Sequence, residues 1–280
     1  MSVSRAGNRT LIFGRIEIDQ VSISLGSGAD AFEAVHGLDF SVTPGELVCI
    51  LGPSGCGKST LLGALAGHLS ISKGKLTVDG EPVAAPSPHR GMVFQQHTLF
   101  PWKKVRANVA FGPKMRGIGK LERERSADEM LALVGLSGFE NFYPSQLSGG
   151  MQQRVEIARV LINHPHVLLM DEPFSALDAL TRAKMHDVLL DIWTKIPTTT
   201  LFVTHDIDEA LFLADRVIMM SARPGRVIED IRMPFARPRH PELVTEPEFA
   251  RLKRHFLELL RIPRDATPLP RLSPLGVMAR

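Results

Sequence analysis

A glycine-rich loop that directly follows an unbroken apolar run constrains the fold of this chain more than any other feature. The apolar run, residues 47–51, is typical of a strand buried on both faces of a parallel sheet. The loop matches the pattern G-x-x-x-x-G-K-[ST], and its members are Gly52, Pro53, Ser54, Gly55, Cys56, Gly57, Lys58, Ser59 and Thr60. A helical pattern over residues 61–66 follows. This order predicts a parallel α/β sheet with a phosphate-binding loop at a strand end.

The residues of the loop predict what binds there. Its glycines let backbone N–H groups converge on phosphate oxygens. We expect Lys58 to neutralise charge on the β- and γ-phosphates of ATP, and the Ser59 hydroxyl to coordinate Mg²⁺ as the cofactor.

Further buried strands alternate with helices along the chain. Strands are predicted at residues 91–95, 167–170, 201–203 and 217–220, and helices at 126–134, 155–161 and 182–193. This alternation predicts a doubly wound parallel sheet. Earlier strands at 16–21 and 40–42 are expected to form a small antiparallel portion, and residues from about 98 to 164 a helical lobe.

Three polar residues follow buried strands, at the ends where open α/β sheets bind ligands. Asp171 is expected to hold Mg²⁺, and Glu172 to polarise the attacking water as general base. His205, the only one of ten histidines in such a position, is expected to bind the γ-phosphate and to orient Glu172 or the water. A surface Asp-Glu pair and a structural histidine are the alternatives. Repulsion between adjacent carboxylates, which a nearby cation relieves, favours the functional interpretation.

A second glycine-rich turn opens the helix predicted near residue 155. In the octapeptide 147–154, Ser148 is the predicted N-cap, and Gly149 and Gly150 allow backbone N–H groups to approach an anion. A second phosphate cradle implies a second nucleotide, which another copy of the chain would supply most simply. The alternative is an ordinary loop that leads into a helix.

Together, these ordered motifs resemble those of the ATP-binding cassette (ABC) ATPases over residues 16–235. The octapeptide resembles the family's signature motif, in which this turn caps the γ-phosphate of ATP on the opposite subunit. Gln95 resembles the glutamine that contacts Mg²⁺ and the water in the family's reaction. Ser175 and Asp178 resemble the D-loop along the dimer interface, although a helix-start turn explains them nearly as well.

The resemblance implies a P-loop NTPase fold with a RecA-like sheet core and a helical subdomain. It implies a homodimer that closes head to tail on two ATP molecules. One chain would supply the binding and catalytic residues of each site, namely Lys58, Ser59, Gln95, Asp171, Glu172 and His205. The other chain would supply the signature residues Ser148, Gly149, Gly150 and Gln152.

Two positions depart from the family pattern. Leu25 stands where the family usually stacks adenine on an aromatic residue, with Phe32 as a candidate substitute. Met151 replaces the common glutamine of the signature motif, which puts a ribose or cross-interface contact in doubt.

The segment after Gln95 resembles the nitrate/sulfonate/taurine importer branch, because Pro101 and Trp102 follow it. This branch implies an ATP-hydrolysing subunit of an importer for a small oxyanion, taurine or another alkanesulfonate first and nitrate or bicarbonate next. Leu99, Phe100 and Trp102 would receive a coupling helix of the membrane subunit, with a core position equally open for Leu99. The implied partners are two integral membrane permease subunits and, through them, a periplasmic or lipid-anchored solute-binding protein. The subunit would lie peripherally on the cytoplasmic face of the inner membrane.

The composition and the N-terminal sequence exclude several other classes of protein and site. No apolar run approaches the ~18–20 residues of a membrane helix, and no secretory signal is visible at the N-terminus. Cys49 and Cys56 lack metal-ligand spacing, so we expect no zinc site. No basic patch with interleaved aromatic residues indicates a nucleic-acid partner.

Two other functions remain as alternatives. A P-loop kinase would have no use for the signature motif. A soluble ABC ATPase acting on nucleic acid or ribosomes would usually carry coiled-coil insertions or a second cassette.

The ends of the chain are expected to lie outside the ATPase domain. Residues 1–15 are expected to form a tail. Residues 236–280 are expected to form a linker, one amphipathic helix that begins with a capping box at 245–248, and a frayed end beyond Pro263. From Arg232 onward, ten Lys and Arg oppose five Asp and Glu. We interpret this basic excess as a solvated surface, with contact to anionic lipid or a partner as the alternative.

Overall fold

The computed structural model of the chain describes residues 13–28 and 31–261. Its centre is a six-stranded sheet in the order β10-β9-β3-β8-β7-β6. The strands are β3 (Leu47–Leu51), β6 (Arg90–Val93), β7 (Val167–Asp171), β8 (Thr199–Thr204), β9 (Arg216–Met220) and β10 (Val227–Arg232). All neighbouring pairs are parallel except β10 with β9. This confirms the predicted parallel α/β core.

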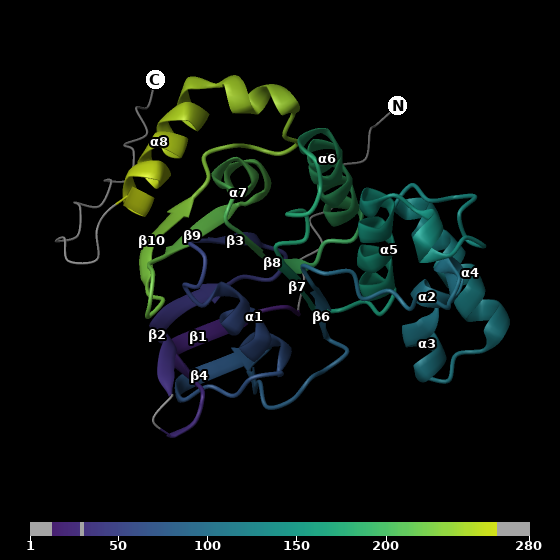
Figure 1. Ribbon diagram of the computed structural model, residues 1–280, viewed down its shortest axis with the longest axis horizontal. Helices are drawn as coiled ribbons and strands as arrows, with labels where there is room; N and C mark the ends of the chain where they lie inside the picture. Colours follow the sequence, from purple (N-terminus) through teal and green to yellow (C-terminus); the bar gives the residue numbers. More distant parts are fainter. Residues whose placement is uncertain (1–12, 29–30, 262–280) are drawn as a thin grey trace, which may run out of the picture.

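A second, antiparallel sheet has the order β2-β1-β4-β5 (Figure 1). It contains β1 (Ile16–Leu25), β2 (Phe32–Val42), β4 (Lys73–Val78) and β5 (Glu81–Pro82). The strands expected at 16–21 and 40–42 are parts of the longer β1 and β2. Strand β4 was not predicted, because only its second half is buried and its apolar pattern is short.

Side chains alternate across β3, and this alternation builds two cores. Val48 and Ile50 face α1 (Lys58–Ala66) and the antiparallel sheet. Leu47, Cys49 and Leu51 face the opposite side, which helices cover. The helix α1 therefore lies between the two sheets (Figure 1), and both faces of β3 are excluded from water.

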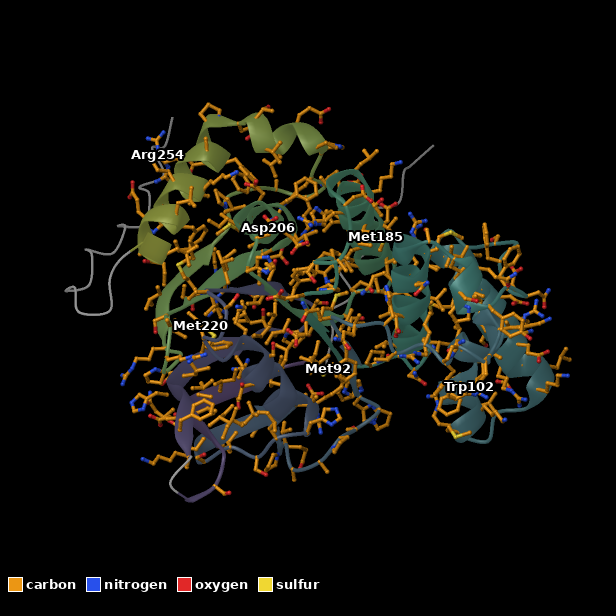
Figure 2. The ribbon with its side chains drawn as sticks, in the orientation of Figure 1. Met92, Trp102, Met185, Asp206, Met220 and Arg254 are labelled. Carbon is orange, nitrogen blue, oxygen red and sulfur yellow. The ribbon has the colours of Figure 1, made fainter. Side chains whose placement is uncertain are left out.

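The helical lobe extends to one side of the sheets (Figure 1). It contains α2 (Val105–Val109), α3 (Phe111–Met115), α4 (Lys120–Leu133) and α5 (Gly149–Leu161), with a short 3-10 helix at Pro144–Gln146. Leu99 is buried in the core beneath the lobe, which favours the core position for Leu99 over a contact with a membrane subunit. Trp102, in contrast, has 71% of its surface exposed and lies on the lobe away from the sheets (Figure 2).

The C-terminal half of the chain adds α6 (Ala179–Lys195), α7 (Ile207–Leu213) and α8 (Pro247–Arg261). The expected apolar stripe of α8 is buried, at Phe249, Leu252, Phe256 and Leu259. The expected capping box is wrong. Thr245 ends a 3-10 helix (Pro241–Thr245), and its hydroxyl donates to the carbonyl of Glu242 at 2.7 Å instead of accepting from the helix.

The end beyond Pro263 and most of the 1–15 tail lie outside the described residues. Among the helices that the structure does describe, none combines the length and the apolar character needed to cross a bilayer.

Candidate active site

The site forms where three parallel strands end at the same edge of the central sheet. In the parallel registers, Leu51 of β3 pairs with Thr204 of β8, and Asp171 of β7 pairs with Val203 of β8. The phosphate-binding loop, Asp171 with Glu172, and His205 each follow one of these strand ends. The sheet register alone therefore brings together residues that are far apart in the sequence.

The loop presents the N-terminus of α1 to a cleft. Gly57 caps this helix with a left-handed φ of 93°, and a Cβ there would lie 2.5 Å from Val35. Neither a side-chain cap nor an acidic residue occupies the first turn of α1. The first backbone N–H groups of the helix are therefore available to an anion such as a phosphate.

The ammonium of Lys58 lies inside the loop, with only 5% of the residue exposed. Its Nζ donates to the carbonyls of Gly52 at 2.8 Å and Pro53 at 3.0 Å. A buried ammonium with neutral partners has an unfavourable electrostatic energy that a bound anion would lower. The geometry thus supports the expected role of Lys58 as the cation of a phosphate site.

Oxygen ligands suited to Mg²⁺ lie beside the loop. The Ser59 hydroxyl donates to Asp171 Oδ1 at 2.9 Å. Burial raises the pKa of the Asp171 carboxyl, and the hydrogen bond from Ser59 opposes this shift. A hydroxyl and a half-buried carboxylate are the hard oxygen ligands that Mg²⁺ takes in nucleotide sites, so the residues present fit the ion. Gln95 lines the same cleft.

Glu172 and His205 form a hydrogen-bonded pair, with 2.9 Å between Glu172 Oε2 and His205 Nδ1. The backbone of Glu172 has a φ of 44°, a left-handed conformation that is strained for a residue with a side chain. Its N–H donates to the carbonyl of Val203 at 3.0 Å. The Glu172 side chain is 18% exposed and that of His205 is 56% exposed. Glu172 lines the cleft described next, whereas His205 and Asp171 are not among the residues that line it and lie beside it through their hydrogen bonds to Glu172 and Ser59.

The cleft itself has a volume of about 380 Å³. Its lining includes six of the loop residues expected to bind ATP, together with Glu172 and Gln95. Leu25 and Phe32 line it as well, and they are direct cross-strand partners in the β1–β2 pair. The ring of Phe32 thus lies next to Leu25, the position at which the family usually has an aromatic residue. Arg223, which sequence reasoning did not single out, also lines the cleft.

The second glycine-rich turn faces elsewhere. Ser148 is the N-cap of α5, as predicted, and its Oγ accepts from the N–H of Met151 at 3.4 Å. None of the described residues that line the cleft is Ser148, Gly149 or Gly150. A Cβ on Gly150 would lie 2.7 Å from Thr181, so the turn packs closely on the start of α6.

Gln152 and Met151, the residues after the two glycines, hold the signature turn against the rest of the protein. The amide nitrogen of Gln152 donates to the carbonyls of Pro144 at 3.0 Å and Leu147 at 3.3 Å, and so holds the preceding loop. Met151 is half-buried against the core under the lobe, which explains an apolar residue there. A role for Gln152 toward ATP stays a prediction.

The D-loop residues have distinct contacts. Asp178 caps α6, and the N–H of Thr181 that donates to it at 3.0 Å lowers the pKa of its carboxyl. The Ser175 hydroxyl donates to the carbonyl of Glu172 at 2.9 Å and accepts from the Gln95 amide at 3.4 Å. Ser175 therefore links Gln95 to the backbone of Glu172, a connection that the sequence pattern did not reveal.

Comparison with known proteins agrees with this geometry. Residues 35–175 match the family model described as ABC transporter. The chain is 45% identical to a taurine import ATP-binding protein of Roseobacter denitrificans, over 81% of this chain and 82% of that protein. It is 43% identical to a nitrate import ATP-binding protein of Synechococcus elongatus, over 90% of this chain and 93% of that protein. A solved dimeric ATP-binding cassette bound to ADP and phosphate has a TM-score of 0.68 at 30% identity, over 79% of this chain and 100% of that chain.

The similarities to these import proteins extend over most of the chain, and the phosphate loop, the signature turn and the strand-end carboxylates all lie within residues 35–175, which match the family model. The fold of the solved cassette is the one described above. The chain belongs to the ABC transporter family, as one of its ATP-hydrolysing ATP-binding subunits.

Proposed function

We propose that two copies of this chain hydrolyse ATP in shared sites and that hydrolysis drives the import of a small oxyanion through a membrane permease. The hydrogen-bonded Glu172–His205 pair beside the phosphate-binding loop carries the hydrolytic part of the proposal. The signature turn does not line the cleft of its own chain, and this separation supports the proposal that two copies share each site.

In this mechanism, the loop N–H groups and Lys58 bind the β- and γ-phosphates. Ser59, Asp171 and Gln95 would hold Mg²⁺, which when bound neutralises phosphate charge. Glu172 accepts a proton from the water that attacks the γ-phosphorus, and the bond to the ADP oxygen breaks. His205 holds the Glu172 carboxylate by its Nδ1, 2.9 Å away, and so orients the base.

The second copy would complete each site. The turn at Ser148 offers backbone N–H groups at the N-terminus of α5, a 13-residue helix, yet it does not line the cleft of its own chain. A head-to-tail dimer would place this turn over the γ-phosphate held by the partner. The solved cassette that this chain resembles is dimeric, which supports a dimer of this chain.

The proposed work is transport of taurine or another alkanesulfonate, with nitrate or bicarbonate as the alternative. The taurine and nitrate import relatives support an importer. Two integral permease subunits, fed by a periplasmic or lipid-anchored solute-binding protein, would hold the subunit peripherally on the cytoplasmic face of the inner membrane. The exposed Trp102 ring, 5.7 Å from that of Phe100, offers an apolar contact for a permease helix. A non-transport role on nucleic acid or ribosomes has less support.

Replacing Glu172 with Gln should lower the hydrolysis rate by ~10²–10⁴-fold because the water loses its proton acceptor. ATP binding should persist, since phosphate contacts are unchanged, and an ATP-bound dimer should accumulate. Phosphate release and size-exclusion chromatography measure the two effects. Hydrolysis at the normal rate would refute the assignment of the base.

Replacing Ser148 with Arg should abolish hydrolysis but leave the affinity of the monomer for ATP unchanged, because the turn lies outside the cleft of its own chain. Ser145→Arg is the matched control, because Ser145 is an exposed serine of the 3-10 helix just before the turn. Loss of the helix cap costs about 1 kcal/mol, so melting temperatures should accompany the assay. Equal loss of ATP binding would show that the turn acts within its own chain.

Replacing Phe32 with Ala should weaken ATP binding about fivefold through loss of ~1 kcal/mol of stacking, while Leu25→Phe should strengthen it. Neither change should alter the affinity for tripolyphosphate, which has no base. Isothermal titration calorimetry measures both ligands. Unchanged ATP affinity in Phe32→Ala would remove this ring from the base site.

The solute can be identified with the complete transporter in lipid vesicles, including its permease and solute-binding protein. Taurine should stimulate ATP hydrolysis more than nitrate or bicarbonate at equal concentrations. Stimulation by nitrate or bicarbonate with no response to taurine would overturn the choice of solute while leaving the importer mechanism intact.

A further inference from the structure

The turn between β9 and β10 carries Arg223 to the phosphate-binding loop. Arg223 lines the cleft together with Gly55, Lys58 and Phe32. A Cβ built on Gly55 would lie 3.0 Å from Nη2 of Arg223 and 3.4 Å from its Nε. The guanidinium group therefore lies directly against the backbone of the loop, although Gly55 and Arg223 are far apart in the sequence.

Backbone contacts fix this turn in place. The N–H of Gly225 donates to the carbonyl of Ala34, and the N–H of His36 donates to the carbonyl of Gly225, both at 2.9 Å. A Cβ on Gly225 would lie 2.0 Å from the carbonyl oxygen of Cys56, so the turn also touches the loop itself. The position of Arg223 is thus set by β2 and by the loop, the same two segments that shape the cleft.

The charges around the cleft favour an anionic ligand at this position. Lys58 and Arg223 are the cations that line it, and Glu172 is the one carboxylate among its described lining residues. Within residues 13–28 and 31–261, Arg223 takes part in no salt bridge, and the partners of Lys58 are uncharged. Two cations beside one anion-binding loop repel each other until a multiply charged anion lies between them. The planar guanidinium group also matches the oxygens of a phosphate better than an ammonium does.

We infer that Arg223 contacts the phosphate chain of the bound nucleotide, as a second cation beside Lys58, and so contributes to nucleotide affinity. The inference rests on the proposed binding of ATP in this cleft. It assigns Arg223 to the phosphates and not to the base. The same contact would be available to ADP, because it belongs to binding and not to hydrolysis.

The test compares Arg223→Gln with Arg226→Gln, an exposed arginine of the same turn that does not line the cleft. Competition titrations would give the affinities for ADP, tripolyphosphate and adenosine. Arg223→Gln should bind ADP and tripolyphosphate about tenfold more weakly, the factor expected for one charge-assisted hydrogen bond, and adenosine as well as the unmodified protein does. Arg226→Gln should match the unmodified protein, and Arg223→Lys should recover part of the loss.

Two results would overturn the inference. One is an unchanged affinity of Arg223→Gln for ADP, and the other is an equal loss for adenosine, which would assign Arg223 to the base. Equal melting temperatures of the two glutamine variants would exclude a folding defect. Failure of the unmodified protein to bind ADP at all, or retention of binding in Lys58→Ala, would instead refute the proposed nucleotide site, so the two failures are distinguishable.

Discussion

The parallel pairing of β3 with β8 and of β8 with β7 is the constraint on which the rest of the molecule depends. It brings three strand ends to one edge of the sheet, and a polar group of the site follows each end. The pairing requires β3 to be buried on both faces, by α1 on one side and by the C-terminal helices on the other. The two cores are therefore what holds the phosphate loop, Glu172 and His205 in mutual reach.

Several groups of the site are in electrostatically or conformationally unfavourable states. Lys58 has a buried ammonium with uncharged partners, burial raises the pKa of Asp171, and Glu172 has a left-handed backbone. The two electrostatic costs, at Lys58 and Asp171, become smaller when a phosphate anion and a divalent cation bind together, because the opposite charges then lie within contact distance. The protein thus gains stability from the ligand, and the carboxylate of Glu172, on its left-handed backbone, lies 2.9 Å from Nδ1 of His205.

The sequence was sufficient for the features that depend on local pattern. Short segments with a clear pattern of apolar and turn-forming residues determine these features. They are the loop at Lys58, the buried strands around it and the cap at Ser148. Features that depend on long-range packing were either missed, as for β4 and Arg223, or left between alternatives, as for Leu99 and Phe32. The strand β4 is buried over only half its length, and Leu99 lies in the core because the lobe folds over it. Phe32 reaches Leu25 through a strand pair whose register shifts several times, and Arg223 reaches Gly55 only through the sheet.

We propose that each ATP site is divided between two copies of the chain. The proposal rests on two surfaces of one chain, a cleft with a phosphate loop and a signature turn outside that cleft. The most direct measurement is the crystal structure of the Glu172→Gln variant with ATP and Mg²⁺. We predict a head-to-tail dimer in which Ser148 of one copy lies within hydrogen-bond distance of the γ-phosphate held by Lys58 of the other. A γ-phosphate contacted only by residues of its own chain would contradict it.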